Sequence, residues 1–413
     1  MRIALTSYRS KPHCGGQGVY VRALSRALVD LGHSVEVFSG PPYPDLDPRV
    51  ALTAVPSLDL YREADPFRVP RPSEFRTPTD VLEFLTMCTA GFPEPRTFSR
   101  RVAPLLAARR AEFDVVHDNQ SLGPALLRLP AAGVPLVSTI HHPITVDRRL
   151  ALAGVPWQRQ LTIRRWFGFV RYQARVAARM PLSIVPSRSS MDDIVADLGV
   201  RRTQLREVPN GVDTELFRPR GARVAGRLVS MCSADVPLKG LQVLLRAVAE
   251  LPESSPVHLI AVARPEPGGA TEKLVSDLGI AHRVTFVNGL SDDELAELVA
   301  SAELMCVPSL YEGFSLPAVE AMASGTPLVA SATSALPDVV GRDGRCGVLV
   351  PPGDHRALAA ALHDLHGDAE RRVAMGAAAR ERAVSTFSWA ATAQATVDVY
   401  REAIALTGES HPC

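Results

Sequence analysis

Residues 311–331 read YEGFSLPAVEAMASGTPLVAS and combine a glycine-bearing loop, a short amphipathic helix and an apolar strand. Glu312 stands in the loop, and Glu320 follows eight positions later inside the expected helix. Pro317 is tolerated in a first helical turn, so we expect the helix to begin just before it. The backbone amides around Phe314, Ser315 and Leu316 would then point out of the helix and attract an anion.

The two glutamates limit which anionic ligand can bind at this helix start. A second carboxylate against an amide-lined anion site is unfavourable, so we expect Glu312 to face hydroxyl groups or a developing positive charge beside bound phosphates. Glu320 is placed to accept hydrogen bonds from neutral hydroxyls, such as a ribose diol. A nucleotide-sugar meets these conditions. The alternative is a surface helix with solvated acids, and the apolar strands on both flanks argue against it.

Size and composition favour a two-domain globular protein. The chain has 413 residues, 46% of them hydrophobic, with a net charge of +1, so we expect two cores and no nucleic-acid partner. Its six cysteines have no paired spacing and indicate reduced thiols rather than disulfides or zinc. The opening MRIALTSY is too short for a signal-peptide core, and no apolar run is long enough to span a bilayer. We expect a cytoplasmic protein.

Strand and helix patterns alternate through both halves of the chain. Nearly all-apolar strands between amphipathic helices predict parallel sheets covered on both faces, in the α/β class. A Pro/Gly/Arg-rich stretch at 209–226 marks the linker, and residues 41–99 read as a long insertion over the first half. We expect two doubly wound, Rossmann-like domains at 1–212 and 213–386, a closing helix in 387–413, and a ligand cleft between the domains.

In the first half, small residues and histidines follow the strands. Gly16 lies in HCGGQG, where the backbone can approach a phosphate at a helix start; the alternative is a tight turn. His141 and His142 end the strand VPLVSTI and could exchange a proton or bind a hydroxyl. The alternatives are structural histidines, or a metal site with His117 and Asp118. In the second half, Lys239 precedes a helix and could neutralise a diphosphate, unless it is only a polar loop residue.

With these motifs in place, nearly the whole chain resembles the retaining family-4 glycosyltransferases of GT-B fold. The segments that carry the likeness are GGQGVYVRALSRALVDLGHSVEV, STIHH, VPSRSS, VPNGVDTELFRP, PLKGL and EGFSLPAVEAMASGTPLVAS, the last with two glutamates separated by seven residues. The resemblance implies a transferase without cofactor or metal that moves a hexosyl group from a UDP- or GDP-sugar to an acceptor hydroxyl, with retention at the anomeric carbon.

The resemblance also implies roles for individual residues. His141, Glu312 and Lys239 would act in catalysis, His141 and Glu312 at the transferred sugar and Lys239 on the diphosphate. The expected donor-binding residues are Gly16, Lys239, Phe314, Ser315, Leu316 and Glu320, with the last on the ribose. The closing helix would cross back onto the first domain. No second side chain is placed as a covalent nucleophile, so we expect same-face attack, with the departing phosphate as proton acceptor rather than a glycosidase carboxylate pair.

One expected cation is missing. The family commonly has an arginine five positions before the lysine, and this chain has Ala234 there. Arg264, at the end of the next strand in AVARPEPGG, is our candidate for the substitute. Without such a substitute the chain would be a catalytically reduced nucleotide-sugar binder or a GT-B-fold epimerase. A nicotinamide oxidoreductase is disfavoured because the dinucleotide fingerprint and its ribose acid are absent.

We expect the acceptor to be a small molecule, a glycan or a lipid-linked group, and no residue pattern names it. We expect it to contact the first domain at the 41–99 insertion and at Asp118, Asn119, Gln120 and His142. Residues 159–179 contain six arginines, no acid and four aromatic residues. This composition allows a basic amphipathic helix in weak contact with the inner face of a membrane. The alternative, which we favour, is an ordinary domain helix whose arginine stems cover its apolar face.

Overall fold

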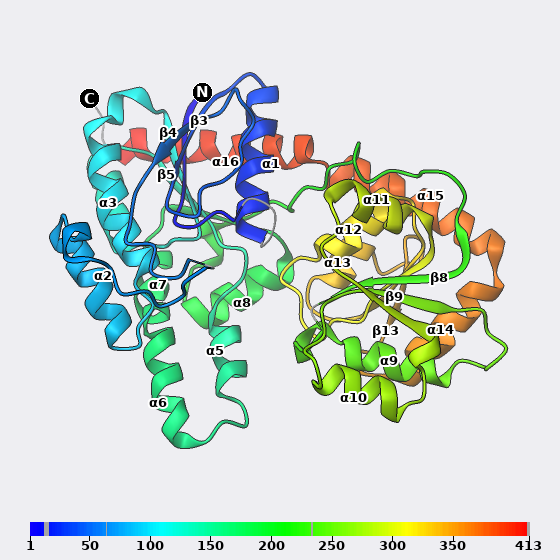
Figure 1. The fold of residues 1–413 in the computed structure, drawn as a ribbon. Coiled ribbons are helices and arrows are strands. Elements are labelled where there is room, and N and C mark those ends of the chain that lie inside the picture. The colour runs from blue at the N-terminus through cyan, green and yellow to red at the C-terminus, as the bar shows by residue number, and fades with distance from the viewer. Residues whose placement is uncertain (12–15, 63, 233, 411–413) are drawn as a thin grey trace. The chain divides into compact units, whose positions relative to one another are not determined.

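The computed structural model describes residues 1–11, 16–62, 64–232 and 234–410. The chain divides into two compact units (Figure 1). Unit 1 comprises Met1–Val208 and Thr392–Cys413, and unit 2 comprises Pro209–Ala391. The structure thus changes unit at 208/209 and 391/392, where the sequence predicted boundaries at 212/213 and 386/387.

Unit 1 contains, in its described residues, a parallel sheet in the order β3-β2-β1-β4-β5-β6-β7. In the interior strand β1, five of the six residues are buried, which is the pattern of a strand covered on both faces. The strands are β1 (Arg2–Ser7), β2 (Ser34–Ser39), β3 (Ala51–Ala54), β4 (Val115–Asn119), β5 (Leu136–Thr139), β6 (Leu182–Val185) and β7 (Leu205–Glu207).

The helices of unit 1 connect these strands, as expected for parallel neighbours. They are α1 (Gly16–Asp30), α2 (Pro78–Cys88), α3 (Glu94–Ala108), α4 (Arg128–Ala131), α5 (Thr145–Leu152), α6 (Trp157–Trp166), α7 (Val170–Ala177), α8 (Arg188–Leu198) and most of α16 (Trp389–Ser410). Short 3-10 turns occur at η1 (Pro72–Glu74), η2 (Arg110–Glu112), η3 (Pro124–Leu127), η4 (Phe167–Phe169) and η5 (Arg202–Gln204).

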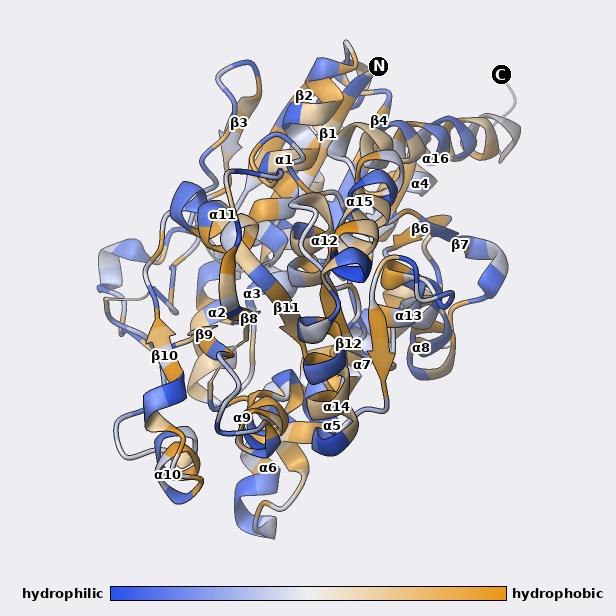
Figure 2. Ribbon diagram, turned by 90° about the vertical axis from the view of Figure 1, so that its right-hand side faces the viewer, coloured by the Kyte–Doolittle hydropathy of each residue, from blue (hydrophilic) through white to orange (hydrophobic). Residues whose placement is uncertain are grey.

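Unit 2 repeats the plan with a parallel sheet in the order β10-β9-β8-β11-β12-β13. All residues of β11 and β12 are buried, and both strands are largely orange in Figure 2. The strands are β8 (Val224–Met231), β9 (His258–Val262), β10 (Val284–Val287), β11 (Ala302–Val307), β12 (Leu328–Ser331) and β13 (Val348–Val350). The helices and turns are η6 (Pro237–Lys239), α9 (Leu241–Glu250), α10 (Ala270–Asp277), η7 (Ala281–Arg283), α11 (Asp292–Ser301), α12 (Leu316–Ala323), α13 (Leu336–Val340), α14 (His355–Gly367) and α15 (Ala369–Thr386).

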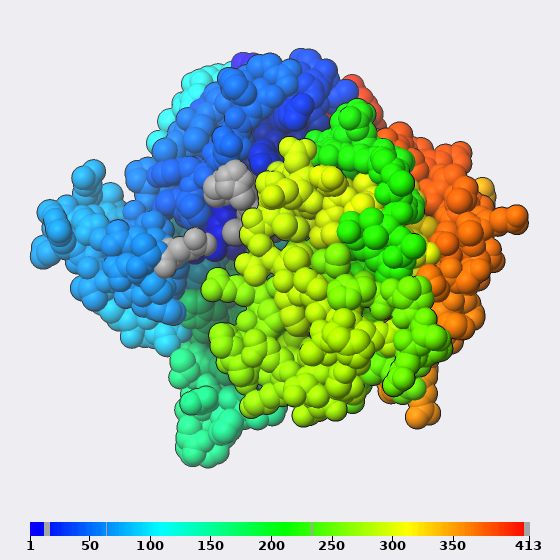
Figure 3. Space-filling model, turned by 45° about the vertical axis from the view of Figure 1, so that its right-hand side comes forward, coloured from blue at the N-terminus to red at the C-terminus, as the bar shows by residue number. Residues whose placement is uncertain are grey.

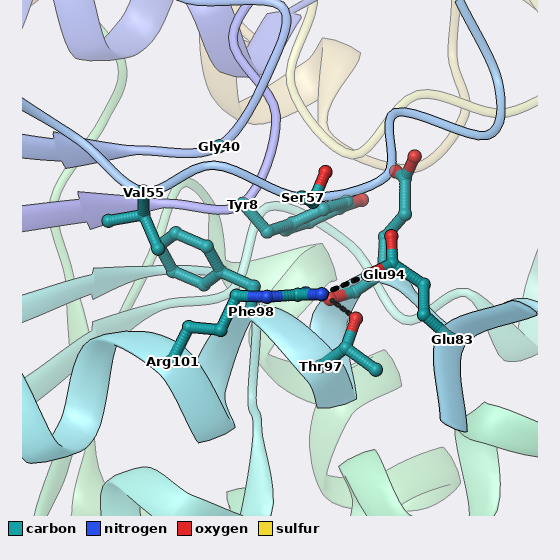
Figure 4. A pocket seen from close by; sticks show the side chains of 9 residues that line it. All are labelled: Tyr8, Gly40, Val55, Ser57, Glu83, Glu94, Thr97, Phe98 and Arg101. Atoms are coloured by element: carbon teal, nitrogen blue, oxygen red, sulfur yellow. Dashed lines mark hydrogen bonds and ion pairs between the residues drawn. The ribbon is translucent and has the colours of Figure 1, made fainter. Parts of the chain in front are cut away.

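The 41–99 insertion forms part of the framework of unit 1 rather than a separate segment lying over it. It supplies the edge strand β3 and the helix α2, and its end leads into α3. Arg101 pairs with the buried Glu83, and Arg9 pairs with the buried Glu94. Glu83, Glu94 and Arg101 line a small cavity at the carboxyl ends of β1, β2 and β3 (Figure 4). Burial raises the pKa of Glu94 to about 7.

The basic segment 159–179 is not one continuous helix. It is divided into α6, η4 and α7. The rings of Trp166 and Phe169 pack against Phe92 at centroid distances of 5.3 Å, so these aromatic residues stabilise the unit itself. Trp157 and Leu161, on the α6 segment that protrudes at the lower edge of Figure 3, remain exposed. Among the described residues, no helix has the length and apolar character needed to cross a membrane.

The closing helix α16 is anchored in unit 1 by a buried hydrogen bond. The hydroxyl of Tyr400, fully buried, lies 2.6 Å from Nδ1 of His117 on β4. The other ring nitrogen of His117 lies 2.7 Å from the Thr139 hydroxyl, and Glu402 pairs with Arg206. From Thr392 onward, the helix therefore belongs to the unit formed by the first half of the chain.

We predict that Tyr400→Phe lowers the free energy of unfolding by about 1–3 kcal/mol, because it leaves Nδ1 of the buried His117 without its partner. Chemical denaturation would measure this loss. Tyr43→Phe is the matched control, since that ring is 38% exposed, and should change stability by less than about 0.5 kcal/mol. Equal effects of the two substitutions would contradict the anchoring role.

Candidate functional site

Two loops meet at the carboxyl edge of the unit 2 sheet. One follows β8 and contains η6, and the other follows β11. The amide of Leu310 donates to the Leu238 carbonyl at 2.7 Å. Gly240, at the start of α9, has a φ of +68°, and a Cβ atom there would lie 1.9 Å from the Pro308 carbonyl oxygen. Only glycine allows this approach.

The contact between the loops brings Lys239 and Glu312 together. Nζ of Lys239 lies 2.9 Å from Oε1 of Glu312, and the Ser309 hydroxyl donates to the same oxygen at 2.8 Å. The Glu312 side chain is 8% exposed and that of Lys239 is 37% exposed. A nearly buried carboxylate is thus held by a cation that solvent still reaches.

Helix α12 begins directly after this pair. Ser315 is its N-cap and accepts a hydrogen bond from the Ala318 amide, and Pro317 lies in the first turn, as the sequence predicted. Like every helix start, this one has amides without partners inside the helix, and the helix dipole makes the region attractive to anions. The ring of Phe314 packs edge-to-face on Phe387 at 5.9 Å, which helps to fix the loop.

Glu320 lies on α12 and is partly buried. Its pKa is raised to about 7, chiefly by burial and further by the negative charge of Asp292. Within the described part of the chain, no side chain forms a hydrogen bond or ion pair with its carboxyl group. An acid in this state is suited to accept hydrogen bonds from a ligand that arrives with neutral hydroxyls.

The segment after β8 contains Ala234, which stands at the position where the family commonly has an arginine. Ala234 is buried within the unit 2 core. The adjacent Asp235 accepts hydrogen bonds from the Glu266 amide and the Thr271 hydroxyl, both at 2.9 Å. Asp235 therefore ties this segment to the loop after β9, which carries the exposed Arg264. No motif or periodicity in the sequence indicated this contact.

In unit 1, His141 follows β5 and is held by two consecutive amide side chains at the end of β4. Its Nε2 lies 2.8 Å from Oδ1 of Asn119, and its backbone N–H donates to Oε1 of Gln120 at 2.7 Å. The ring of Tyr20 packs edge-to-face on the imidazole at 4.7 Å. Burial, with a smaller contribution from His142, lowers the pKa of His141 to about 3, so the ring is neutral at pH 7.

Three of the four residues predicted to contact an acceptor, Asp118, Asn119 and Gln120, are buried. Asp118 is fully buried, and its carboxylate accepts hydrogen bonds from Thr6, Ser121, Leu122 and Ser138. Gln120 is 2% exposed, and its amide also donates to the His142 carbonyl at 2.9 Å. Through these hydrogen bonds, Asp118 and Gln120 stabilise the ends of the strands. The side chain of His142 is 40% exposed, and its Nε2 lies 3.0 Å from Oδ2 of Asp147.

Gly16 and His117 are the remaining candidates in unit 1. Gly16 is the first residue of α1, while the preceding residues of its motif, 13–15, lie outside the described residues. His117 uses both ring nitrogens in hydrogen bonds within unit 1, so the alternative of a metal site with Asp118 is not supported. Among the described residues, no three His, Cys, Asp or Glu side chains are grouped as metal ligands.

Two family models together match most of the chain. The model of "Glycosyltransferase Family 4" matches residues 14–216, and that of "Glycosyl transferases group 1" matches residues 213–382. The MMP alpha-(1->4)-mannosyltransferase of Mycolicibacterium hassiacum is 59% identical over 98% of this chain and 99% of its own. The D-inositol 3-phosphate glycosyltransferase of Stackebrandtia nassauensis is 32% identical, over 98% of this chain and 92% of its own.

Solved structures show the same architecture. Sucrose-phosphate synthase from Thermosynechococcus elongatus superposes with a TM-score of 0.69 at 24% identity, over 98% of this chain and 99% of its own. Anabaena HepE in complex with UDP-glucose gives a TM-score of 0.68 at 19% identity, over 97% of this chain and all of its own. The chain belongs to the family-4 glycosyltransferases and has their GT-B fold.

We predict that Gly240→Ala destabilises unit 2 more than Gly279→Ala. Both glycines have a φ of +68°, but a Cβ at Gly279 would meet no atom within 4 Å. The control should therefore cost about 1–2 kcal/mol for the left-handed backbone alone, and Gly240→Ala about 1–3 kcal/mol more for the clash with Pro308. Denaturant titrations would compare the two, and equal losses would show that the loops need no close approach.

Proposed function

We propose that this glycosyltransferase moves a mannosyl group from a nucleotide-sugar to a glycan hydroxyl and forms an α-(1→4) bond. The observation that carries the proposal is the 59% identity, over nearly the whole length of both chains, to an enzyme named for that reaction. GDP-mannose, the common activated form of mannose, is the first donor to test, and UDP-sugars are the second. We place the enzyme in the cytoplasm, where such donors occur.

The arrangement in unit 2 suits a donor of this kind. Lys239 and the first amides of α12 would stabilise the charge that develops on the departing diphosphate, a task that other transferases give to a metal ion. Glu312 would hold a hydroxyl of the sugar through its second oxygen, because Lys239 and Ser309 occupy the first. Glu320 would accept hydrogen bonds from the ribose. Together these residues support transfer without a metal.

The stereochemistry follows from donor and product. Nucleotide-linked mannose has the α configuration, so an α-linked product means retention. The ion-pair partner of Glu312 is Lys239, a cation, rather than a second carboxylate, so the two-carboxylate arrangement of glycosidases does not apply. We infer that the acceptor hydroxyl attacks on the face from which the diphosphate leaves, and that a phosphate oxygen takes its proton.

The test is product analysis. We predict that the enzyme, GDP-mannose and an α-(1→4)-linked mannoside yield a longer mannoside whose new bond is α-(1→4) by NMR, and that EDTA leaves the rate unchanged. A β-linked product would contradict retention. Failure of both GDP- and UDP-sugars to raise the melting temperature of the protein would contradict donor binding altogether.

We predict that donor binding strengthens as the pH rises through 7. The pKa of Glu320 is raised to about 7, whereas the charged carboxylate is the form that accepts hydrogen bonds from a diol. Protonation below pH 7 therefore competes with binding, and the dissociation constant should be about tenfold higher at pH 6 than at pH 8. Calorimetry with an intact nucleotide-sugar, whose pyrophosphate does not titrate in this range, measures it. Glu320→Gln should abolish the difference, and an unchanged pH profile would exclude this role.

We predict that Arg264→Ala lowers turnover at least about threefold, because this cation would replace the arginine missing at Ala234 on the leaving diphosphate. The matched control is Arg371→Ala, an exposed arginine at the start of α15, which should retain full turnover. Steady-state rates with saturating donor compare the variants. A smaller loss for Arg264→Ala would remove Arg264 from the account.

A further inference from the structure

Asn119 and Gln120 were predicted to touch the acceptor, yet their side chains are directed at His141. Asn119 contacts the imidazole and Gln120 contacts the backbone N–H of the same residue. Gln120 has a φ of +50°, an uncommon conformation for a residue with a side chain, and in it both ends of its amide are engaged. Two consecutive residues thus fix the ring and the backbone of one histidine.

The orientation of the Asn119 amide follows from its second partner. Its Nδ2 donates to the Gln17 carbonyl at 3.4 Å, and a flipped amide would set two carbonyl oxygens against each other. Oδ1 therefore faces Nε2 of His141 at 2.8 Å. Because an amide oxygen only accepts hydrogen bonds, Nε2 must carry the proton.

In a neutral imidazole with a proton on Nε2, Nδ1 is a bare acceptor. Among the described residues, none forms a hydrogen bond with Nδ1 of His141. The ring is partly buried and packs against the ring of Tyr20. These contacts fix the orientation of the ring, and therefore the direction in which Nδ1 can accept a hydrogen bond. The lowered pKa of His141, about 3, agrees with a ring that stays neutral during turnover.

We propose that Asn119 is a positioning residue that holds His141 in the Nε2–H tautomer, so that Nδ1 accepts a hydrogen bond from a hydroxyl group of the transferred sugar. The use of this acceptor atom rests on the proposed function, whose substrates carry hydroxyl groups. The assignment is chemically selective. A bare nitrogen attracts a hydroxyl donor and repels a phosphate oxygen, so His141 recognises the sugar and takes no part in neutralising the leaving group.

The tautomer can be measured directly. Protonated and bare imidazole nitrogens differ widely in ¹⁵N chemical shift, and the His141 signals are assigned by their loss in His141→Gln. The proposal expects a protonated Nε2 and a bare Nδ1 in the full-length wild-type protein at pH 7. A proton on Nδ1 would overturn it, and this measurement needs no variant at Asn119.

Variants at Asn119 test the consequence. Asn119→Leu removes the acceptor and should lose the fixed tautomer and lower kcat at least about tenfold, with a much smaller change in the donor dissociation constant. Asn119→Asp keeps an acceptor oxygen and should keep the proton on Nε2 and recover part of kcat. Gln394→Leu, an exposed amide on α16, is the control and should change neither quantity.

The results distinguish a failure of the positioning role of Asn119 from a failure of the proposed function. An unchanged kcat in Asn119→Leu, with the tautomer lost, would show that the tautomer has no bearing on transfer and would overturn the positioning role. If the wild-type protein transfers no mannosyl group, the proposed function fails, whereas the ¹⁵N spectrum still decides whether Asn119 fixes the tautomer.

Discussion

The close approach of two loops at the carboxyl edge of the unit 2 sheet is the constraint on which the site depends. Gly240 admits the Pro308 carbonyl, and the Leu310 amide closes the contact on Leu238. As a result Lys239 and Glu312, 73 positions apart in the chain, share a hydrogen bond. In a parallel sheet the ends of neighbouring strands lie at one edge, and this edge carries the lysine, the acid and the start of α12 together.

The pairing of Lys239 with Glu312 also suggests how the site responds to its ligand. A nearly buried carboxylate requires a partner, and Lys239 and Ser309 supply it for Glu312. A bound diphosphate would offer Lys239 a stronger anion, and a sugar hydroxyl would offer Glu312 a new donor. If the proposed function holds, donor binding replaces the ion pair between Lys239 and Glu312 by two new contacts. Lys239 then pairs with the diphosphate and Glu312 with a sugar hydroxyl, so that both charged groups keep a partner.

Much of this could be predicted from the sequence, because the signals were local. Apolar strands between amphipathic helices predicted two parallel sheets, and the run from Glu312 to Glu320 predicted a helix start with Ser315 and Pro317, as observed. The edge strand β3 was missed because it is short and largely exposed. The interior location of Asp118, the bond between His117 and Tyr400 and the use of Asn119 on His141 depend on contacts between distant segments. Periodicity and spacing do not encode such contacts.

The proposed function requires Lys239 to bind the diphosphate of a nucleotide-sugar at this edge. Calorimetric titration of GDP-mannose, or of the UDP-sugar that binds, into the wild-type protein and into Lys239→Met tests it most directly. We expect a dissociation constant at least about tenfold higher in the variant, equivalent to about 1.4 kcal/mol, and a wild-type affinity that weakens with added salt. Equal affinities in a correctly folded variant would contradict it.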